Sequence, residues 1–368
     1  MKRFFQIAVI ILSATILGIF LIQGKEETGV PKKKTKVGVI LNGLCLDGSW
    51  GQAHYEGLEI CAENLNLEMI YKENVPENEM SILFMDELID AGCEIIVCDS
   101  FGYEEYLLEE AEKNPEIYFL HATGVVEKRN VATYFGRIYQ MRYLSGIVAG
   151  MQTRTGQIGY VAAFPISEVN RGINAFTQGV RSVNPGAQVY VVWSDTWTGD
   201  EETEKATLKL LDAYPKVDVL AMHTDSLKVL DIAEERGIWS IGYNMDNREK
   251  YPNTFLTAPV WNWENFYEQC ITDCLQDKFK GKHYWEGVES GIVSLAPLSP
   301  NVEEGTEEII DREMKRLNSG RYDVFYGPIW DNTGILRVES NTCMSDEAML
   351  KRFDWYVDGV TIYEEQGK

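Results

Sequence analysis

The feature of this sequence that most limits its fold is an alternation of short apolar runs with longer amphipathic stretches. The run from Lys36 to Leu41 is rich in β-branched residues and predicts a buried strand. Further strands are predicted at 68–71, 94–98, 117–120 and 131–135, with helices at 51–64, 80–91 and 103–113. Strands that alternate with helices of about 10–15 residues indicate right-handed βαβ units on a parallel sheet.

The same alternation starts again after residue 137. Strands are predicted at 158–161, 188–192, 217–221, 239–241 and 255–259, and helices at 139–151, 169–183, 203–213, 227–235 and 263–279. In the helix at 139–151, Gly146 and Gly150 lie one turn apart, which lets a neighbouring backbone approach closely. Two consecutive α/β sheets predict a protein with two lobes and a cleft between them.

The expected lobes are discontinuous in sequence. One combines residues 36–137 with 258–287, and the other combines 138–257 with 288–335, so the chain crosses near residues 137, 257 and 288. The remaining residues, 336–368, form a tail for which we expect a helix at 344–357 that packs against a lobe, with docking to a permease partner as an alternative.

The N-terminus differs from the rest of the chain. Lys2 and Arg3 precede a nearly continuous apolar stretch at 4–22, which is the pattern of an export signal. No cysteine stands directly after that stretch and no clear cleavage site ends it, so we treat 1–35 as a signal or anchor with a lysine-rich tether. We expect the protein to work outside the cytoplasmic membrane, attached through this segment, or secreted or periplasmic if the segment is cleaved.

Charge and cysteine content exclude several classes. The 368 residues contain 34 Lys and Arg against 57 Asp and Glu, a net charge of −23, which argues against nucleic acid as a partner. The seven cysteines form no CxxC pair, so most are predicted to be buried free thiols rather than zinc ligands or a disulfide framework. A chain of this length can bury a core without such crosslinks.

Ligands in open α/β sheets bind beyond the carboxyl ends of the strands, so the segments after the predicted strands are the candidates for ligand contact. These segments are 42–50, 99–103, 164–165, 193–197, 223–226, 243–246 and 261–263. Five of the nine tryptophans lie in them (50, 193, 197, 261 and 263), mixed with Asp and Asn. Flat aromatic faces with carboxylates and amides suit a planar, nitrogen-rich ring, whereas a sugar would require more polar side chains. The alternative is that these tryptophans only pack the lobes.

Catalytic and metal-binding patterns are missing from the sequence. It contains no GxSxG, GxGxxG, P-loop or HExxH motif, and the four histidines lack metal-ligand spacing. His223 beside Asp225 could be half of a catalytic dyad, but no nucleophile motif accompanies it. We therefore expect neither an enzyme nor a metal or cofactor site.

Several of these segments, in this order and spacing, resemble the basic membrane protein (BMP) family of ABC-transporter substrate-binding proteins. The resemblance covers residues 36 to about 330, and its markers include 47–50, 100–103, 121–124, 130–134, 143–146, 171–176, 182–185, 223–226 and 242–246. It implies the type I periplasmic-binding-protein fold, a cleft that closes on a purine nucleoside or base, and an ABC permease as partner. We expect a monomer.

The resemblance also implies site residues. Trp50 matches the family's first-lobe aromatic residue, Trp197 the second-lobe aromatic that stacks on the opposite purine face, and Asp246 a carboxylate that holds ligand. Where nucleoside-binding members have a lysine, this chain has Trp261, which favours a free, adenine-like base over a nucleoside. The remaining candidates for ligand contact are Asp47, Phe101, Asn174 and Asp225. A membrane-anchored sensor that uses the same cleft for signalling is the alternative function.

Overall fold

The computed structural model describes residues 34–364, and the chain from Thr35 onward forms one compact unit. The predicted signal or anchor at 1–35 therefore lies outside the described residues except for its last two. Within the described part of the chain, none of the helices is long and apolar enough to cross a membrane.

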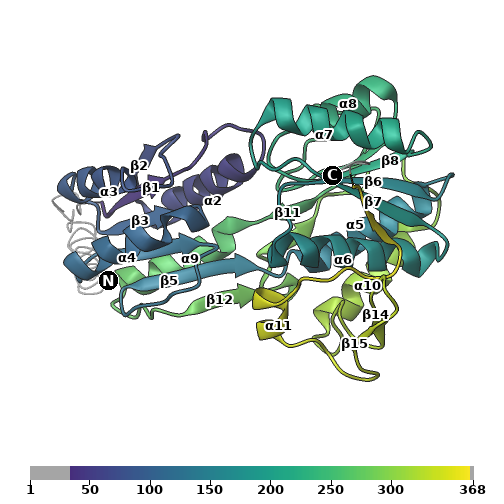
Figure 1. Ribbon diagram of the computed structural model, residues 1–368. Coiled ribbons are helices and arrows are strands. Elements are labelled where there is room, and N and C mark those ends of the chain that lie inside the picture. Colours follow the sequence, from purple (N-terminus) through teal and green to yellow (C-terminus); the bar gives the residue numbers. More distant parts are fainter. Residues whose placement is uncertain (1–33, 365–368) are drawn as a thin grey trace, which may run out of the picture. The chain divides into compact units, whose positions relative to one another are not determined.

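Two six-stranded parallel sheets organise this unit, and each defines one lobe (Figure 1). The first sheet has the order β12-β5-β4-β3-β1-β2. Its strands are β1 (Lys36–Ile40), β2 (Glu68–Lys72), β3 (Ile95–Cys98), β4 (Tyr118–Ala122), β5 (Val131–Gly136) and β12 (His283–Glu286). Its helices are α2 (Trp50–Leu65), α3 (Ser81–Asp90), α4 (Glu104–Lys113), the short 3₁₀ helix η1 (Phe101–Tyr103) and α9 (Trp263–Leu275). The predicted alternation of strands and helices is confirmed here.

The second sheet has the order β10-β9-β8-β6-β7-β16. Its strands are β6 (Gln157–Ala162), β7 (Gln188–Trp193), β8 (Val219–His223), β9 (Trp239–Ile241), β10 (Phe255–Thr257) and β16 (Val360–Ile362). The helices of this lobe are α5 (Tyr139–Gln152), α6 (Ser167–Val183), α7 (Asp200–Ala213) and α8 (Lys228–Arg236). In both sheets the order doubles back around the first strand of the lobe, so the carboxyl ends of neighbouring strands meet at a switch point where ligands bind.

The chain passes between the two sheets three times. It crosses from β5 to α5, from β10 through β11 (Pro259–Trp261) to α9, and from β12 through the 3₁₀ helix η2 (Val288–Ser290) to β13 (Val293–Leu295). Strands β11 and β13 pair antiparallel, so two of the crossings are bonded to each other. The pair of β11 and β13 thus forms part of the connection between the two lobes.

Helices α5 and α6 pack very closely in the second lobe. A Cβ atom at Gly146 would overlap the backbone of Phe176, and one at Gly150 would approach Val180 Cα within 3.0 Å. The predicted close approach at these two glycines is confirmed, and it allows the helices to bury nearly all of α5.

The C-terminal segment is part of the second lobe. After α10 (Thr306–Asn318) and a small antiparallel pair of β14 (Ile329–Trp330) and β15 (Leu336–Val338), it forms the short helix α11 (Asp346–Lys351) and ends in β16, which pairs with β7. The helix predicted at 344–357 is wrong beyond residue 351. The chain is not helical there and is bonded to α6 instead, with Asn170 donating to the Phe353 carbonyl over 2.9 Å.

Candidate functional site

The loop after β1 begins the first-lobe side of the site. The carboxylate of Asp47 accepts backbone N–H groups from Ser49, Gly51 and Gln52 at 2.7–3.0 Å. These are donors that a helix leaves unpaired in its first turn, so Asp47 caps α2. Its polar atoms serve the helix, and its negative charge stands at the helix N-terminus.

Trp50 is the first residue of α2 and is fixed on several sides. Its indole N–H donates to the Asp99 carbonyl over 3.1 Å. Trp261 and Trp263 meet its ring nearly edge-on, with centroids 5.9 and 5.7 Å away. The ring is half-buried, so part of it is open to solvent.

The buried side chain of His54 packs against the ring of Trp50. His54 stacks on Trp263 with centroids 4.7 Å apart, touches Trp50 edge-on at 4.4 Å, and lies 2.6 Å from the Tyr267 hydroxyl. Burial lowers the pKa of His54 to about 3, so the ring is neutral at physiological pH. No pattern in the sequence signals this role, because it depends on α9 packing against α2.

Asp99 comes directly after β3 and was not among the predicted site residues, although its segment was. One carboxyl oxygen accepts the backbone N–H of Asn42 over 3.0 Å. Its other oxygen, Oδ2, is buried and has no hydrogen-bond partner within the described residues. Burial raises the pKa of this carboxyl well above its usual range.

Trp197 lies on the second lobe, in the turn between β7 and α7. The backbone carbonyl oxygen of Trp197 accepts the N–H of Asp225 over 2.8 Å and the hydroxyl of Thr224 over 2.5 Å, and these bonds hold the turn in place. The half-buried ring meets Phe164 edge-on, with centroids 5.9 Å apart. Trp50 and Trp197 are thus presented by different lobes, and each packs against aromatic residues of its own surroundings.

Asp225 lies just after β8. Its Oδ1 accepts the side-chain N–H of Asn244 over 2.7 Å. Burial raises the pKa of Asp225 to about 8, and the negative charge of Asp47 adds to the rise.

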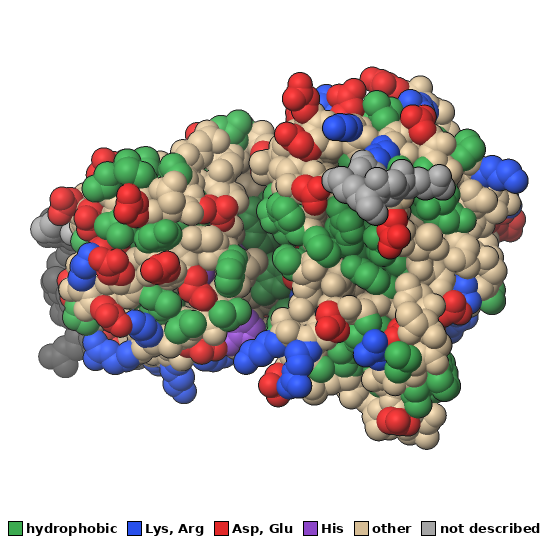
Figure 2. Space-filling model, in the orientation of Figure 1, with side chains coloured by type: hydrophobic (Ala, Val, Ile, Leu, Met, Phe, Trp, Pro, Cys, Tyr) green, Lys and Arg blue, Asp and Glu red, His purple; other side chains and the backbone are tan. Residues whose placement is uncertain are grey.

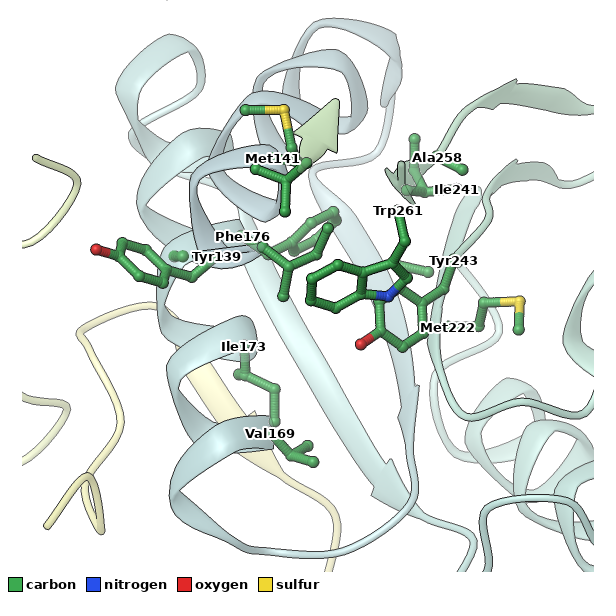
Figure 3. Packing of buried hydrophobic residues seen from close by; sticks show 14 of the residues in the cluster. Tyr139, Met141, Val169, Ile173, Phe176, Met222, Ile241, Tyr243, Ala258 and Trp261 are labelled. Carbon is green, nitrogen blue, oxygen red and sulfur yellow. The ribbon is translucent and has the colours of Figure 1, made fainter. Parts of the chain in front are cut away.

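Trp261 lies on the crossing strand β11 and is 6% exposed. Its indole N–H donates to Asn244 Oδ1 over 3.0 Å, and Figure 3 shows the indole beside Tyr243. Its ring packs against Gly136, where a Cβ atom would come within 2.7 Å of the indole. Trp261 therefore occupies the junction between the lobes.

A polar cluster lies behind the second-lobe strand ends. His223 pairs with Glu168 at 3.1 Å and with the Tyr160 hydroxyl at 3.1 Å, and the Arg142 guanidinium lies 3.7 Å from the Tyr243 ring centroid. Burial lowers the pKa of His223 to about 4. The hydrogen-bond partners of His223 are Glu168 and Tyr160 rather than Asp225. His223 and Asp225 therefore do not form the dyad that the sequence suggested.

The other predicted residues are placed differently. Asn174 donates to the Trp355 carbonyl over 2.7 Å and accepts the Val357 N–H over 2.9 Å, so its amide holds the C-terminal segment. Asp246 is exposed and pairs with Arg248. Phe101 is 56% exposed at the start of η1. The structure brings Trp50, Asp225 and Trp261 together through Asn244 and its partners, and it does not bring Asn174 to them.

The space between the lobes is visible from outside. Figure 2 shows a hollow between the two halves of the unit, with hydrophobic side chains at its bottom. In the described part of the chain, no cluster of three or more His, Cys, Asp or Glu side chains could hold a metal ion, and all seven cysteines are free. The chemistry on offer is aromatic stacking and hydrogen bonding.

Two parallel α/β sheets joined by three crossings define the type I periplasmic-binding-protein fold, which solved ABC-transporter solute-binding proteins share. Among solved structures, a transcriptional activator of the comK gene from Bacillus halodurans superimposes with a TM-score of 0.69 at 24% identity. The match covers 78% of this chain and 99% of that one.

Sequence comparison gives the family. The family model described as ABC transporter substrate-binding protein PnrA-like (Bmp) matches residues 34–321, and the chain belongs to this family. A purine-binding protein of Brucella abortus is 31% identical over 349 residues, which is 94% of this chain and 97% of the relative. A protein of Haloferax volcanii named as a putative ABC transporter glucose-binding protein is 31% identical over 315 residues, 85% of this chain and 77% of the relative. Membership makes this an ABC-transporter substrate-binding protein, with a small-molecule ligand and a permease as partner.

Proposed function

We propose that this protein captures a free purine base, with adenine as the best fit, and delivers it outside the cytoplasmic membrane to an ABC importer. The observation that carries the proposal is the presentation of Trp50 and Trp197 at the strand ends of two different lobes. Indole rings from opposite lobes suit a flat ligand that is stacked on both faces. The name of the Brucella abortus relative supports the same ligand class.

Polar side chains would form hydrogen bonds with the edge of the purine ring. Asp225 is the candidate for accepting a hydrogen bond from an exocyclic amine or ring N–H, because Asn244 occupies only one of its oxygens. Phe101 adds an exposed aromatic surface next to Asp99. The polar atoms of Asp47, Asn174 and Asp246 bond elsewhere in the chain, so we leave these three residues out of the proposed contacts.

The ligand class is tested by calorimetry on a chain that begins at Thr35, which keeps every contact described above. Adenine should bind, and unsubstituted purine should bind more weakly, because a site built to pair an amine leaves its own group unpaired without it. Glucose serves as the competing ligand suggested by the Haloferax volcanii relative. Binding of glucose without binding of adenine would reject the purine assignment and leave the family membership unchanged.

A further inference from the structure

The side-chain amide of Asn244 joins three separate segments of the chain. Its Nδ2 donates to Ser49 Oγ over 2.9 Å and to Asp225 Oδ1 over 2.7 Å, and its Oδ1 accepts the Trp261 indole N–H over 3.0 Å. Ser49 belongs to the first lobe, Asp225 to the second, and Trp261 to a crossing strand. Asn244 itself is completely buried.

This set of bonds leaves the amide a single orientation. An indole N–H can only donate, so the amide oxygen must face Trp261 and the NH₂ group must face the other two residues. Both amide hydrogens are then used, one for each lobe. Rotating the amide by half a turn would set the NH₂ group against the indole N–H and break the bond to Trp261.

Ser49 is free to take part in the contact between lobes because it does not cap its own helix. Serine before a helix commonly accepts an N–H from the first turn, but Ser49 makes no such bond at the start of α2. Asp47 caps the helix instead. The buried Ser49 hydroxyl is therefore committed to Asn244 rather than to α2.

The backbone at this point also suits the contact. Asn244 has a φ of 68°, in the left-handed region where asparagine and glycine are favoured. A second bond between lobes lies beside it, from Asn247 Nδ2 to the Gly48 carbonyl over 3.0 Å. Two hydrogen bonds thus join the lobes at Gly48 and Ser49, directly before Trp50.

From these contacts we infer that Asn244 is a positioning residue that fastens the two lobes together and sets Asp225 and Trp261 for the ligand. The part of this inference that concerns ligand rests on the proposed function. Breaking the Asn244–Ser49 bond should let the lobes separate and the ligand leave sooner. The ligand need not touch Asn244 for this effect.

Two variants test the inference in the chain that begins at Thr35. Ser49→Ala removes only the Asn244–Ser49 bond and keeps the Asn247–Gly48 bond, and Asn244→Gly removes the amide while tolerating the backbone conformation. With adenine as the probe, both should raise the dissociation rate by about tenfold or more, as expected for one buried hydrogen bond. The double variant should dissociate no faster than Asn244→Gly alone, because both changes remove the same bond.

Asn66→Gly is the matched control, since Asn66 ends α2 with a φ of 55° on the surface. It should keep the unmodified dissociation rate and thermal stability. An unchanged rate in both Ser49→Ala and Asn244→Gly would overturn the inference. So would a rate that rises only in Asn244→Gly together with a loss of thermal stability, because this would show a role within one lobe.

Small-angle scattering without ligand separates this inference from the proposed function. The radius of gyration should be larger for Ser49→Ala and Asn244→Gly than for the unmodified chain and Asn66→Gly. If adenine does not bind but this difference is found, the purine assignment fails and the role of Asn244 in joining the lobes stands. If adenine binds and all four radii agree, the role of Asn244 is rejected and the ligand assignment stands.

Discussion

The indole rings of Trp261 and Trp263 stack with their centroids 4.4 Å apart and an angle of 10° between their planes. One face of Trp261 is therefore covered, and its N–H is bonded to Asn244. The stacking on Trp263 and the hydrogen bond to Asn244 together prevent the Trp261 ring from changing its rotamer to admit a larger ligand. The bulk that Trp261 contributes to the junction between the lobes is permanent.

Under the proposed function, adenine is expected to bind more tightly than adenosine, because the bulk of Trp261 would compete with a ribose for space. Trp261→Leu should narrow that difference by raising adenosine affinity relative to adenine affinity. Leucine is a better test than lysine, since an ammonium group at this buried position would lack a partner. Calorimetry with both ligands measures the effect. Tighter binding of adenosine than adenine by the unmodified chain would contradict the free-base assignment.

Stacking on both ring faces predicts that Trp50→Ala and Trp197→Ala each weaken adenine binding. The expected loss is about 1–3 kcal/mol per residue, by analogy with base–aromatic stacking elsewhere. Trp330→Ala is the control, because Trp330 is 52% exposed on the C-terminal strand pair and should not affect affinity. The sandwich is rejected if adenine affinity is unchanged in both cleft variants.

The pKa of Asp225, raised by burial to about 8, predicts that ligand affinity depends on pH. A ligand N–H prefers the ionised carboxylate, so binding releases the proton. Affinity should then rise by up to about tenfold per pH unit as pH increases toward 8, and level off above it. Titrations from about pH 6 to about pH 9 measure this slope on both sides of that pKa.

Asp225→Asn should remove the pH dependence while keeping an oxygen for Asn244. Asp212→Asn changes an exposed carboxyl on α7 of the same lobe and should keep the unmodified slope. Affinity that falls as pH rises toward the pKa of Asp225 would mean that the protonated carboxyl donates to the ligand instead.

The contacts of Asn174 predict a role in stability rather than in ligand binding. Asn174→Ala leaves a buried carbonyl at Trp355 and a buried N–H at Val357 without partners, at a cost of about 1–3 kcal/mol for each group. Urea unfolding should show the loss, and adenine affinity should stay the same. A variant that loses affinity but keeps its unfolding free energy would restore Asn174 to the ligand site.

The fold was largely predictable because long amphipathic helices and buried strands repeat in a regular alternation. Strands β12 and β16 were missed for a physical reason. Both lie at sheet edges, and each is only three or four residues long. Neither belongs to the regular alternation of strand and helix, because each pairs with a strand far earlier in the chain, β12 with β5 and β16 with β7.

The site was predictable only in part. Trp50, Trp197 and Asp225 could be predicted because each follows a strand, and residues that follow parallel strands lie at the same edge of the sheet. The role of Asn244 could not be foreseen, since its three partners come together only when two lobes and a crossing strand meet. The local rule for helix N-termini would have named Ser49, the residue directly before α2, rather than Asp47 as the cap.

The central claim, that this cleft takes a purine base, is tested most directly by the ligand that the protein acquires in the cell. Purified protein should be denatured without prior dialysis, and the released small molecules identified by mass spectrometry. Adenine or a closely related free base, in a stoichiometric amount that Asn66→Gly retains and Ser49→Ala reduces, is the predicted result. Release of a sugar in place of any purine would contradict the claim.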